Sequence, residues 1–379
     1  MNDLKNDIKV SIISFAYNHE KYVEQMLKNC LNQKTDFEYE IVIHDDCSTD
    51  RTTQIIREYE KKYPQIVHPI YEEENQYSKG TDIFSLCLKA SKGKYIAICE
   101  GDDYWIDTEK LQMQFDTMES HPDVDMCATN AQERTEDILT QEIRPKKSDG
   151  VLTTPEVILG GGRYLATATL FFRRELFGPD RIMPFEKVIL FDYVFQIKGS
   201  LKGGIYYLDR PTAVYRRATE NSWTVRIERN REERMKHQEI EKRMLRQLDA
   251  DTGGRFHECI EQRLQAYVPF ADQMMGHCEE INEELGTANA DLYLWGMGLR
   301  GEAIEEYCEL NKIVLTGVCD KKNSMVGTKT LFGNDVMSTD EVLRKSKIIL
   351  ASNDVIADAI QESGYHGRVI RMQKYMQLS

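Results

Sequence analysis

The first hundred residues alternate between short apolar runs and longer amphipathic segments. Several runs rich in β-branched and aromatic residues predict buried strands: residues 9–15, 40–44, 66–71 and 95–99. Between them, apolar residues such as Tyr22, Met26 and Cys30 recur every three or four positions, which is typical of helices. Strands that alternate with helices are usually parallel and joined by right-handed crossovers. The pattern therefore predicts a doubly wound α/β sheet.

The alternation of apolar runs and amphipathic segments is less regular from residue 100 to residue 225. A helix is expected at 109–121, ahead of Pro122, and another begins near Asp192. Short strands are expected at 124–129, 166–172, 205–208 and 213–215. The polar, Gly-rich segment 132–165 lacks a clear period, so we expect it to be a connection only.

Composition changes at about residue 225, where long stretches rich in Arg, Glu, Lys and Gln begin. Their thin apolar stripe favours a helical linker or packing arm over a helix that binds nucleic acid or membrane. A new strand–turn–helix unit begins near residue 290. We therefore predict a catalytic domain at 1–225, a charged helical linker at 226–287 and a small Rossmann-like domain at 288–379.

Length and composition limit the classes of protein that remain. At 379 residues the chain is expected to form two or three domains. A net charge of −14 argues against nucleic acid as the main partner. The 9 cysteines are scattered without a C-x-x-C pair, which suits reduced thiols in a cytosolic protein. We expect no signal peptide and no membrane span, and peripheral association with the inner face of the membrane stays open.

The stretch KYIAICEGDDYW carries the strongest chemical signal. Its apolar run predicts a buried strand that ends in Glu100, Asp102 and Asp103. Open α/β sheets bind ligands at the carboxyl ends of their strands. Crowded carboxylates repel each other, and a divalent cation is a common counter-charge. The stretch predicts a metal and diphosphate site, and the alternative is a solvated acidic turn.

Other candidate residues also stand at the ends of strands or in apolar settings. Asp46 follows the second predicted strand, where its carboxylate could accept an N–H from a base. The alternative is that Asp45 or Ser48 caps the next helix, and both can hold together. Tyr17 comes just after the first strand and could lie against a flat base, or it could pack in the core. Asp192 stands in the apolar sequence LFDYVFQ, where partial burial would raise its pKa toward that of a general base. Its alternative role is a helix N-cap.

The segment 296–301 matches G-x-G-x-x-G, with a predicted strand before it and a helix after it. Asp320 lies near the spacing expected for an acid on a ribose hydroxyl. Only a short length of chain remains after Asp320, so we favour a degenerate nucleotide-fold module over true ligand binding.

Several of these stretches together resemble family 2 glycosyltransferases of the GT-A fold: VSIISFAYNHEKYVEQML, EIVIHDDCSTDRT, ASKGKYIAICEGDDYWIDTEKLQ and FDYVFQIKGSLKGGIYYLDRPTAVYRR. The resemblance implies a doubly wound mixed sheet and transfer of a sugar from a nucleoside diphosphate, commonly UDP, with Mn²⁺ or Mg²⁺. It implies that Tyr17 and Asp46 hold the base, Asp102 the ribose and Asp103 the metal. It also implies that Asp192 is the base of an inverting displacement.

The sequence departs from the family pattern in two places. Phe15 replaces a usual proline, and Ala218 replaces the histidine of a Y-R-x-H motif. Arg216 or Arg217 could neutralise the phosphates instead.

The resemblance further implies a glycan or lipid-linked acceptor, synthesis of a surface polysaccharide or glycoconjugate, and a cytoplasmic protein. The charged helical arm makes a homo-oligomer plausible. An inactive nucleotide-sugar-binding or scaffold protein and a sugar nucleotidyltransferase are the alternatives.

Overall fold

The computed structural model describes residues 8–135, 138–177, 191–217, 230–286, 291–321 and 325–376. The chain divides into two compact units, Met1–Ile260 and Glu261–Ser379. The division falls inside the segment expected to be a linker, so this segment is shared between the two units.

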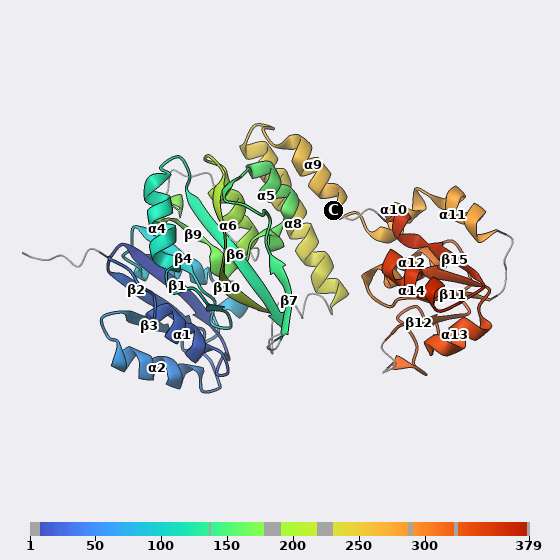
Figure 1. The fold of residues 1–379 in the computed structure, drawn as a ribbon, viewed down its shortest axis with the longest axis horizontal. Coiled ribbons are helices and arrows are strands. Elements are labelled where there is room, and N and C mark those ends of the chain that lie inside the picture. The colour runs from blue at the N-terminus through green and yellow to red at the C-terminus, as the bar shows by residue number, and fades with distance from the viewer. Residues whose placement is uncertain are drawn as a thin grey trace, which may run out of the picture. The chain divides into compact units, whose positions relative to one another are not determined.

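The first unit is built on the alternating strands and helices that the sequence predicts. Its strands β1 (Val10–Ala16), β2 (Tyr39–Asp45), β3 (Val67–Tyr71) and β4 (Tyr95–Ile98) are parallel, in the order β3-β2-β1-β4 (Figure 1). The connecting helices are α1 (Val23–Leu31), α2 (Thr52–Lys62) and α3 (Ile83–Ala90). This order reverses direction at β1, as in a doubly wound sheet, so that prediction is confirmed.

Beyond β4 the sheet becomes mixed. Its path continues through β9 (Phe171–Arg173), β6 (Met126–Thr135), β10 (Ile205–Arg217) and β5 (Tyr104–Trp105). Strand β9 is antiparallel to both β4 and β6, whereas β10 is parallel to β6 and antiparallel to β5. The short strand β5 therefore places the chain just after the acidic turn beside the end of β10.

The middle of the first unit differs from the expectation. The segment expected as a connection contains the end of β6, β7 (Ile138–Ile143), β8 (Gly150–Leu152), α5 (Thr154–Gly160) and the 3-10 turn η2 (Gly162–Tyr164). Figure 1 shows β7 alongside β6. The strand expected at 166–172 is also wrong: it is the turn η3 (Thr167–Thr169) and then the short β9.

The two short strands expected at 205–208 and 213–215 are a single strand, β10. Its register with β6 shifts on either side of Pro211. Proline has no N–H to donate to a neighbouring strand, so it interrupts the ladder without ending the strand. Because of this interruption, the sequence pattern predicted two strands where the structure has one.

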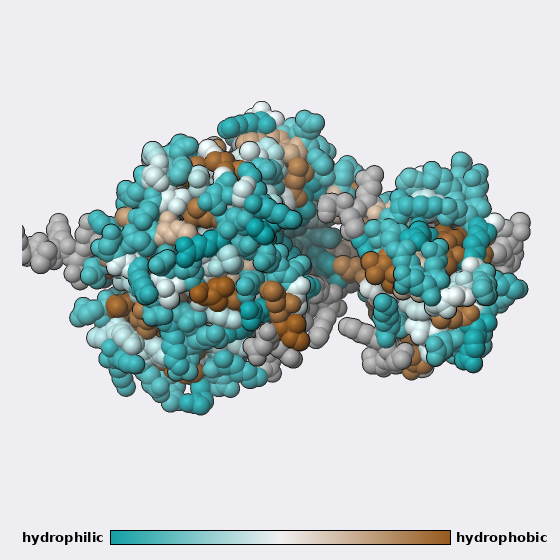
Figure 2. Space-filling model, viewed as in Figure 1, coloured by the Kyte–Doolittle hydropathy of each residue, from teal (hydrophilic) through white to brown (hydrophobic). Residues whose placement is uncertain are grey.

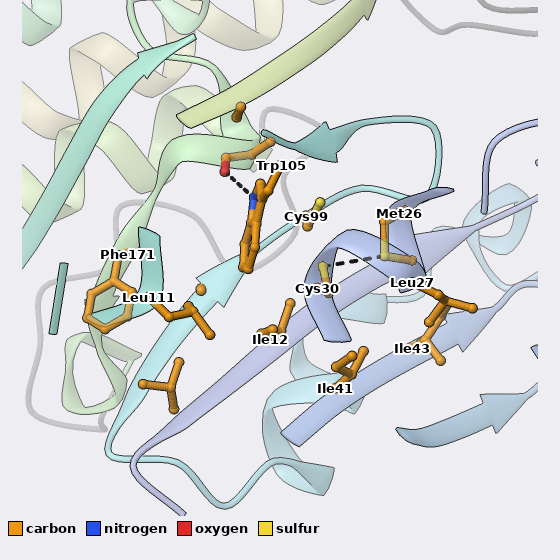
Figure 3. Packing of buried hydrophobic residues seen from close by; sticks show 14 of the residues in the cluster. Ile12, Met26, Leu27, Cys30, Ile41, Ile43, Cys99, Trp105, Leu111 and Phe171 are labelled. Atoms are coloured by element: carbon orange, nitrogen blue, oxygen red, sulfur yellow. Dashed lines mark hydrogen bonds between the residues drawn. The ribbon is translucent and has the colours of Figure 1, made fainter. Parts of the chain in front are cut away.

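Two layers of helices cover this sheet. On one face, α1, α2 and α4 (Lys110–Ser120) bury apolar side chains in a shared core with the strands. Trp105 lies in this core and donates a hydrogen bond from Nε1 to the Ala168 carbonyl at 2.8 Å (Figure 3). On the other face, Phe84 of α3 and Phe195 of α6 (Phe191–Ser200) pack with ring centroids 4.6 Å apart. Together these contacts hold β4 and its acidic end between two rigid layers.

The charged segment after β10 forms helices in both units. Helix α8 (Arg231–Asp251) buries Met244, Leu245 and Leu248, and α9 (His257–Gln265) buries Ile260. Helices α10 (Phe270–Met275) and α11 (Cys278–Leu285) contribute Met274 and Ile281 to the core of the second unit. The apolar stripe of this segment is thus used for packing.

The second unit is a small α/β structure. Its five strands are all parallel, in the order β13-β12-β11-β14-β15: β11 (Leu292–Trp295), β12 (Gly317–Cys319), β13 (Val336–Met337), β14 (Ile348–Ala351) and β15 (Arg368–Arg371). Helices α12 (Leu299–Leu310), α13 (Thr339–Lys345) and α14 (Asp354–Glu362) connect them. The sheet buries one core on each face.

The molecular face seen in Figure 2 is mostly hydrophilic, and its apolar residues form separate small patches. Within the described ranges, no helix is both long and apolar enough to cross a membrane.

Candidate functional site

The turn after β4 is held against the end of β1. Gly101 donates its N–H to the Phe15 carbonyl at 2.8 Å, and Asp103 donates its N–H to the Glu100 carbonyl at 3.0 Å. A Cβ at Gly101 would lie 2.7 Å from His19 Nδ1 and 2.8 Å from the Phe15 carbonyl oxygen. Only glycine fits this close approach, which fixes the position of the acids on either side.

Asp103 is buried in this turn. Its Oδ1 accepts a hydrogen bond from the Arg216 backbone N–H at 2.9 Å. Its Oδ2 is also buried and has no hydrogen-bond partner among the described residues. Burial and the nearby carboxylates of Asp102 and Glu100 raise the pKa of Asp103 well above its usual range. An unsatisfied buried carboxylate oxygen is costly, and a bound cation would satisfy it.

Arg216 brings positive charge to the same turn. Its guanidinium lies 4.3 Å from the Tyr104 ring centroid and 5.0 Å from that of Tyr22. It donates hydrogen bonds to the Asp102 carbonyl and to Gln25 Oε1. Two aromatic rings and two acceptors therefore orient this side chain beside the acidic turn. From the sequence, Arg216 or Arg217 was expected to neutralise the phosphates.

Asp46 lies at the end of β2 and is almost fully buried. Its Oδ1 accepts from the Gln76 N–H at 2.6 Å, and its Oδ2 accepts from the Tyr77 N–H at 3.1 Å. In this structure Asp46 thus holds the loop after β3. Neighbouring Asp45 accepts from the Ser48 N–H and from Thr53 Oγ1, so it supports the start of α2.

Tyr17 comes directly after β1 and is 41% exposed, which excludes the core-packing alternative. The next residue, Asn18, donates its N–H to Ser48 Oγ at 3.0 Å and accepts from the Thr49 N–H at 2.8 Å. The loops after β1 and β2 are therefore tied together, which brings Tyr17 and Asp46 to adjoining loops at the carboxyl edge of the sheet.

Asp192 lies in the first turn of α6, and its Oδ1 accepts from the Tyr193 N–H at 2.8 Å. Burial raises its pKa to about 6. Burial together with the carboxylates of Asp102 and Asp192 raises the pKa of Glu100 to about 8. The electrostatic effect of Asp192 on Glu100 means that α6 brings Asp192 to the acidic turn.

Gly162 lies beside Asp192. A Cβ at Gly162 would lie 3.5 Å from both carboxylate oxygens of Asp192. From the sequence we expected this glycine-rich stretch to be a connection only, because nothing local relates it to a residue thirty positions later.

The structure thus gathers Glu100, Asp102, Asp103, Asp192 and Arg216 at one end of the sheet. Across the described part of the chain, no group of three or more His, Cys, Asp or Glu side chains is arranged to hold a metal ion by itself. Asp103 Oδ2 still fits one ligand position, and Mg²⁺ or Mn²⁺ often takes its remaining ligands from substrate phosphates and water. The substituted position Ala218 lies outside the described residues.

The glycine motif of the second unit has a structural explanation. A Cβ at Gly301 would lie 1.8 Å from the Gly296 carbonyl oxygen, so the first turn of α12 can pack there only with glycine. Asp320 Oδ2 accepts a hydrogen bond from the Met297 N–H at 2.9 Å. These contacts account for a tight turn and for close helix packing.

The mixed sheet and the acidic turn after β4 agree with the GT-A fold expected from the sequence. The structure superposes on a crystal structure of S. aureus TarS residues 1–349 bound to UDP-GlcNAc with a TM-score of 0.51. The likeness covers 82% of this chain and 84% of that one, at 18% identity, and it shows the fold. Residues 11–177, somewhat less than half of the chain, match glycosyl transferase family 2. The match to this family therefore lies within the first unit.

Curated relatives match over the same part of the chain. An uncharacterized protein of Mycobacterium tuberculosis, Rv1520, is 32% identical over 217 residues, which are 56% of this chain and 60% of that protein. The poly(ribitol-phosphate) beta-N-acetylglucosaminyltransferase TarS of Staphylococcus aureus is 30% identical over 206 residues, which are 51% of this chain and 33% of TarS. The chain thus aligns with less than two thirds of each of these relatives.

Proposed function

We propose that this chain is a metal-dependent glycosyltransferase that moves a sugar from a UDP-linked donor to a hydroxyl acceptor and inverts the anomeric centre. The observation that carries the proposal is that one site contains both kinds of aspartate. The buried Oδ2 of Asp103 lacks a partner among the described residues, and Asp192 is a half-buried candidate base. The family match over residues 11–177 supports the reaction class. The UDP-GlcNAc complex of TarS supports UDP as the nucleotide.

In this proposal Tyr17 stacks on the base and Asp102 accepts from the ribose hydroxyls. Asp46 accepts from the N–H of the base. Because both oxygens of Asp46 already accept backbone N–H groups of the loop after β3, the base must use a remaining lone pair or displace one of these bonds. Binding of the nucleotide is then coupled to the position of that loop.

Asp103 would hold Mn²⁺ or Mg²⁺ through Oδ2. The metal would supply positive charge to the diphosphate as it leaves the sugar. The Arg216 backbone N–H keeps the Asp103 carboxylate in place through Oδ1, and the guanidinium of Arg216 adds a second positive charge next to the turn.

Asp192 would take the proton of the attacking acceptor hydroxyl. With a pKa of about 6 it is ionised at neutral pH yet more basic than an exposed aspartate. The acceptor oxygen forms a bond to the anomeric carbon while the bond from that carbon to the diphosphate oxygen breaks. A single in-line displacement of this kind inverts the anomeric centre.

Synthesis of a surface polysaccharide or glycoconjugate is the pathway that we propose, with a glycan or lipid-linked acceptor. TarS is named for its action on poly(ribitol phosphate), and this supports a polymer of the bacterial surface as the type of acceptor. A cytoplasmic protein that associates with the membrane surface, and a homo-oligomer, stay predictions.

Calorimetry with UDP tests the metal site. We expect UDP to bind in the presence of Mn²⁺ or Mg²⁺, and we expect Asp103→Ala to weaken binding at least tenfold, or about 1.4 kcal/mol. Asp116→Ala, an exposed substitution on α4, is the control and should bind as the native chain does. Equal affinity with and without metal would contradict the assignment of Asp103, and no UDP binding under any condition would contradict the proposed donor.

A further inference from the structure

A buried glutamine holds the turn η2 against helix α6. Gln196 lies one turn after Asp192 on α6 and is 0% exposed. Its Nε2 donates to the Gly162 carbonyl at 2.8 Å and to the Leu165 carbonyl at 3.3 Å, and its Oε1 accepts from the Leu165 N–H at 3.2 Å. Three backbone groups of the segment 162–165 are therefore fixed relative to the helix that carries Asp192.

Two aromatic side chains hold the neighbouring parts of this segment. Tyr193 Oη donates to the Ile158 carbonyl of α5 at 2.5 Å, and Trp105 Nε1 donates to the Ala168 carbonyl of η3 at 2.8 Å. Both rings are buried. The backbone from α5 to η3 cannot move away from α6 without breaking buried hydrogen bonds, each worth about 0.5–1.5 kcal/mol. The position of Gly162 is therefore set by its surroundings.

Of the three consecutive glycines in this segment, only the third lacks a structural explanation. A Cβ at Gly160 would lie 2.2 Å from the Tyr164 ring, so packing excludes a side chain there. Gly161 has φ 72°, in the left-handed region that favours glycine. The φ of Gly162 lies outside that region, and the nearest atom to a Cβ there would be 3.3 Å away. Neither backbone conformation nor a severe clash requires glycine at position 162.

The space left by the missing side chain of Gly162 lies beside the carboxylate of Asp192. The heavy atoms nearest to a Cβ at Gly162 would be Tyr193 Cβ, at 3.3 Å, and both Asp192 oxygens, at 3.5 Å. A side chain there would extend toward these oxygens. Asp192 Oδ1 accepts from the Tyr193 N–H, and the two oxygens of a carboxylate offer about four lone-pair positions in all. Asp192 thus keeps capacity for a hydroxyl, and glycine leaves the space beside it open.

The same segment continues to the acidic turn. The side chain of Thr167, in η3, forms a hydrogen bond with Glu100, and the carboxylate of Asp192 acts electrostatically on Glu100. The chain from Gly162 to Thr167 therefore runs from the candidate base to the turn where the donor is proposed to lie. A side chain added at Gly162 would lie at the end of this run that faces the acceptor.

We propose that Gly162 is a specificity-determining residue of the acceptor site, and that its missing side chain lets Asp192 receive a hydroxyl carried on a bulky group such as a sugar ring. This inference rests on the proposed function. Water is the smallest molecule that can replace such an acceptor. In that case the oxygen of water bonds to the anomeric carbon, Asp192 takes its proton and UDP leaves. A side chain at position 162 should therefore favour hydrolysis of the donor over transfer.

Competition between water and alcohols tests this inference. The full chain with Mn²⁺ is given UDP-glucose, UDP-galactose, UDP-GlcNAc or UDP-glucuronic acid, with methanol as a small acceptor probe and methyl glucoside as a bulky one. Released UDP measures total turnover, and mass spectrometry measures the glycoside and the free sugar. We expect the native chain to form a glycoside with both alcohols.

Substitutions of increasing size at Gly162 are the decisive variants. In Gly162→Ala the ratio of glycoside to free sugar should fall about tenfold or more with methyl glucoside and less with methanol, and Gly162→Val should enlarge both effects. Hydrolysis and UDP affinity should persist. Gly276→Ala, in the second unit, is the control. Its Cβ would also have its nearest contact at 3.3 Å with φ outside the left-handed region, and it should keep the native ratio.

Each outcome decides the inference. An unchanged ratio for methyl glucoside in both folded Gly162 variants overturns it, as does an equal loss of hydrolysis and of transfer to both alcohols, which would mean damage to the base. Hydrolysis without any glycoside from the native chain overturns it too, because the space would then admit no bulky hydroxyl. These results leave the proposed function standing. A native chain that releases no UDP from any donor contradicts the proposed function, and the inference falls with it.

Discussion

Asp192 and Asp103 belong to the same candidate site but have different proposed roles. In the proposed function Asp103 holds a cation through its buried Oδ2, whereas Asp192 becomes a useful base because partial burial raises its pKa. We expect Asp192→Asn to lower kcat by about 10²–10⁴-fold, because the amide cannot take a proton. UDP affinity should not change, since Asp192 is proposed to act on the acceptor. Single-turnover transfer and calorimetry measure the two quantities, and unimpaired turnover would remove Asp192 from catalysis.

The pH dependence of kcat/KM is an independent test of Asp192 as the catalytic base. The pKa of Asp192 is raised from 3.8 to about 6, so the carboxyl group gains a proton as the pH falls through that value. We expect kcat/KM of the native chain to fall about tenfold per pH unit below pH 6. The residual activity of Asp192→Asn should lack this step, whereas a step of the same size in the variant would assign it to another group.

At the scale of single residues, the sequence predicted the acidic residues of the site but not the residues that they contact. A strand that ends in clustered carboxylates is visible along the chain, so Asp102, Asp103 and Asp46 could be singled out. The contact between Gly162 and Asp192 was not visible, because the two residues are thirty positions apart and share no local motif. That Asp46 holds a backbone loop is likewise evident only in the folded chain.

At the scale of elements, the acidic turn after β4 packs closely against the end of β1, so that a Cβ at Gly101 would lie 2.8 Å from the Phe15 carbonyl oxygen. We expect Gly101→Ala to destabilise the first unit by about 1–3 kcal/mol, because the new Cβ meets a backbone carbonyl that cannot move freely. It should also weaken binding of metal and UDP by displacing Asp102 and Asp103. Thermal unfolding and calorimetry with UDP measure the two effects.

Gly298→Ala is the matched control for that substitution. A Cβ at Gly298 would meet no atom within 4 Å, and its backbone has φ −78°, which alanine adopts readily. This variant should keep the native UDP affinity. If Gly101→Ala behaved in the same way, the turn would be more tolerant than its contacts with His19 and Phe15 indicate.

The elements themselves were predicted unevenly. Strands β1, β2 and β4 are apolar over most of their length and largely buried, so their pattern can be recognised without tertiary information. Strand β10 was divided at Pro211, and β7 was missed because five of its six residues are exposed. An edge strand of this kind carries no apolar period, since it packs on its neighbour through backbone hydrogen bonds.

For the whole molecule, the site belongs to one compact unit. Every described residue of the candidate site lies between Tyr17 and Arg216, inside the unit Met1–Ile260. We therefore expect a chain that ends at Ala266, after α9, to fold and to bind UDP with metal within about twofold of the full-length affinity. Circular dichroism checks the fold and calorimetry the affinity. A folded truncated chain without UDP affinity would show that the second unit contributes to the donor site.

The sequence by itself determined the α/β character, the parallel strands β1 to β4 and the acids at their ends. These are local properties, set by the spacing of apolar residues and by the residue types directly after each strand. Only the tertiary structure decided that β9 is inserted antiparallel beside β4, that Arg216 lies beside the acidic turn, and that Gly162 lies beside Asp192. Such relations depend on which distant segments meet, and a one-dimensional pattern does not contain that information.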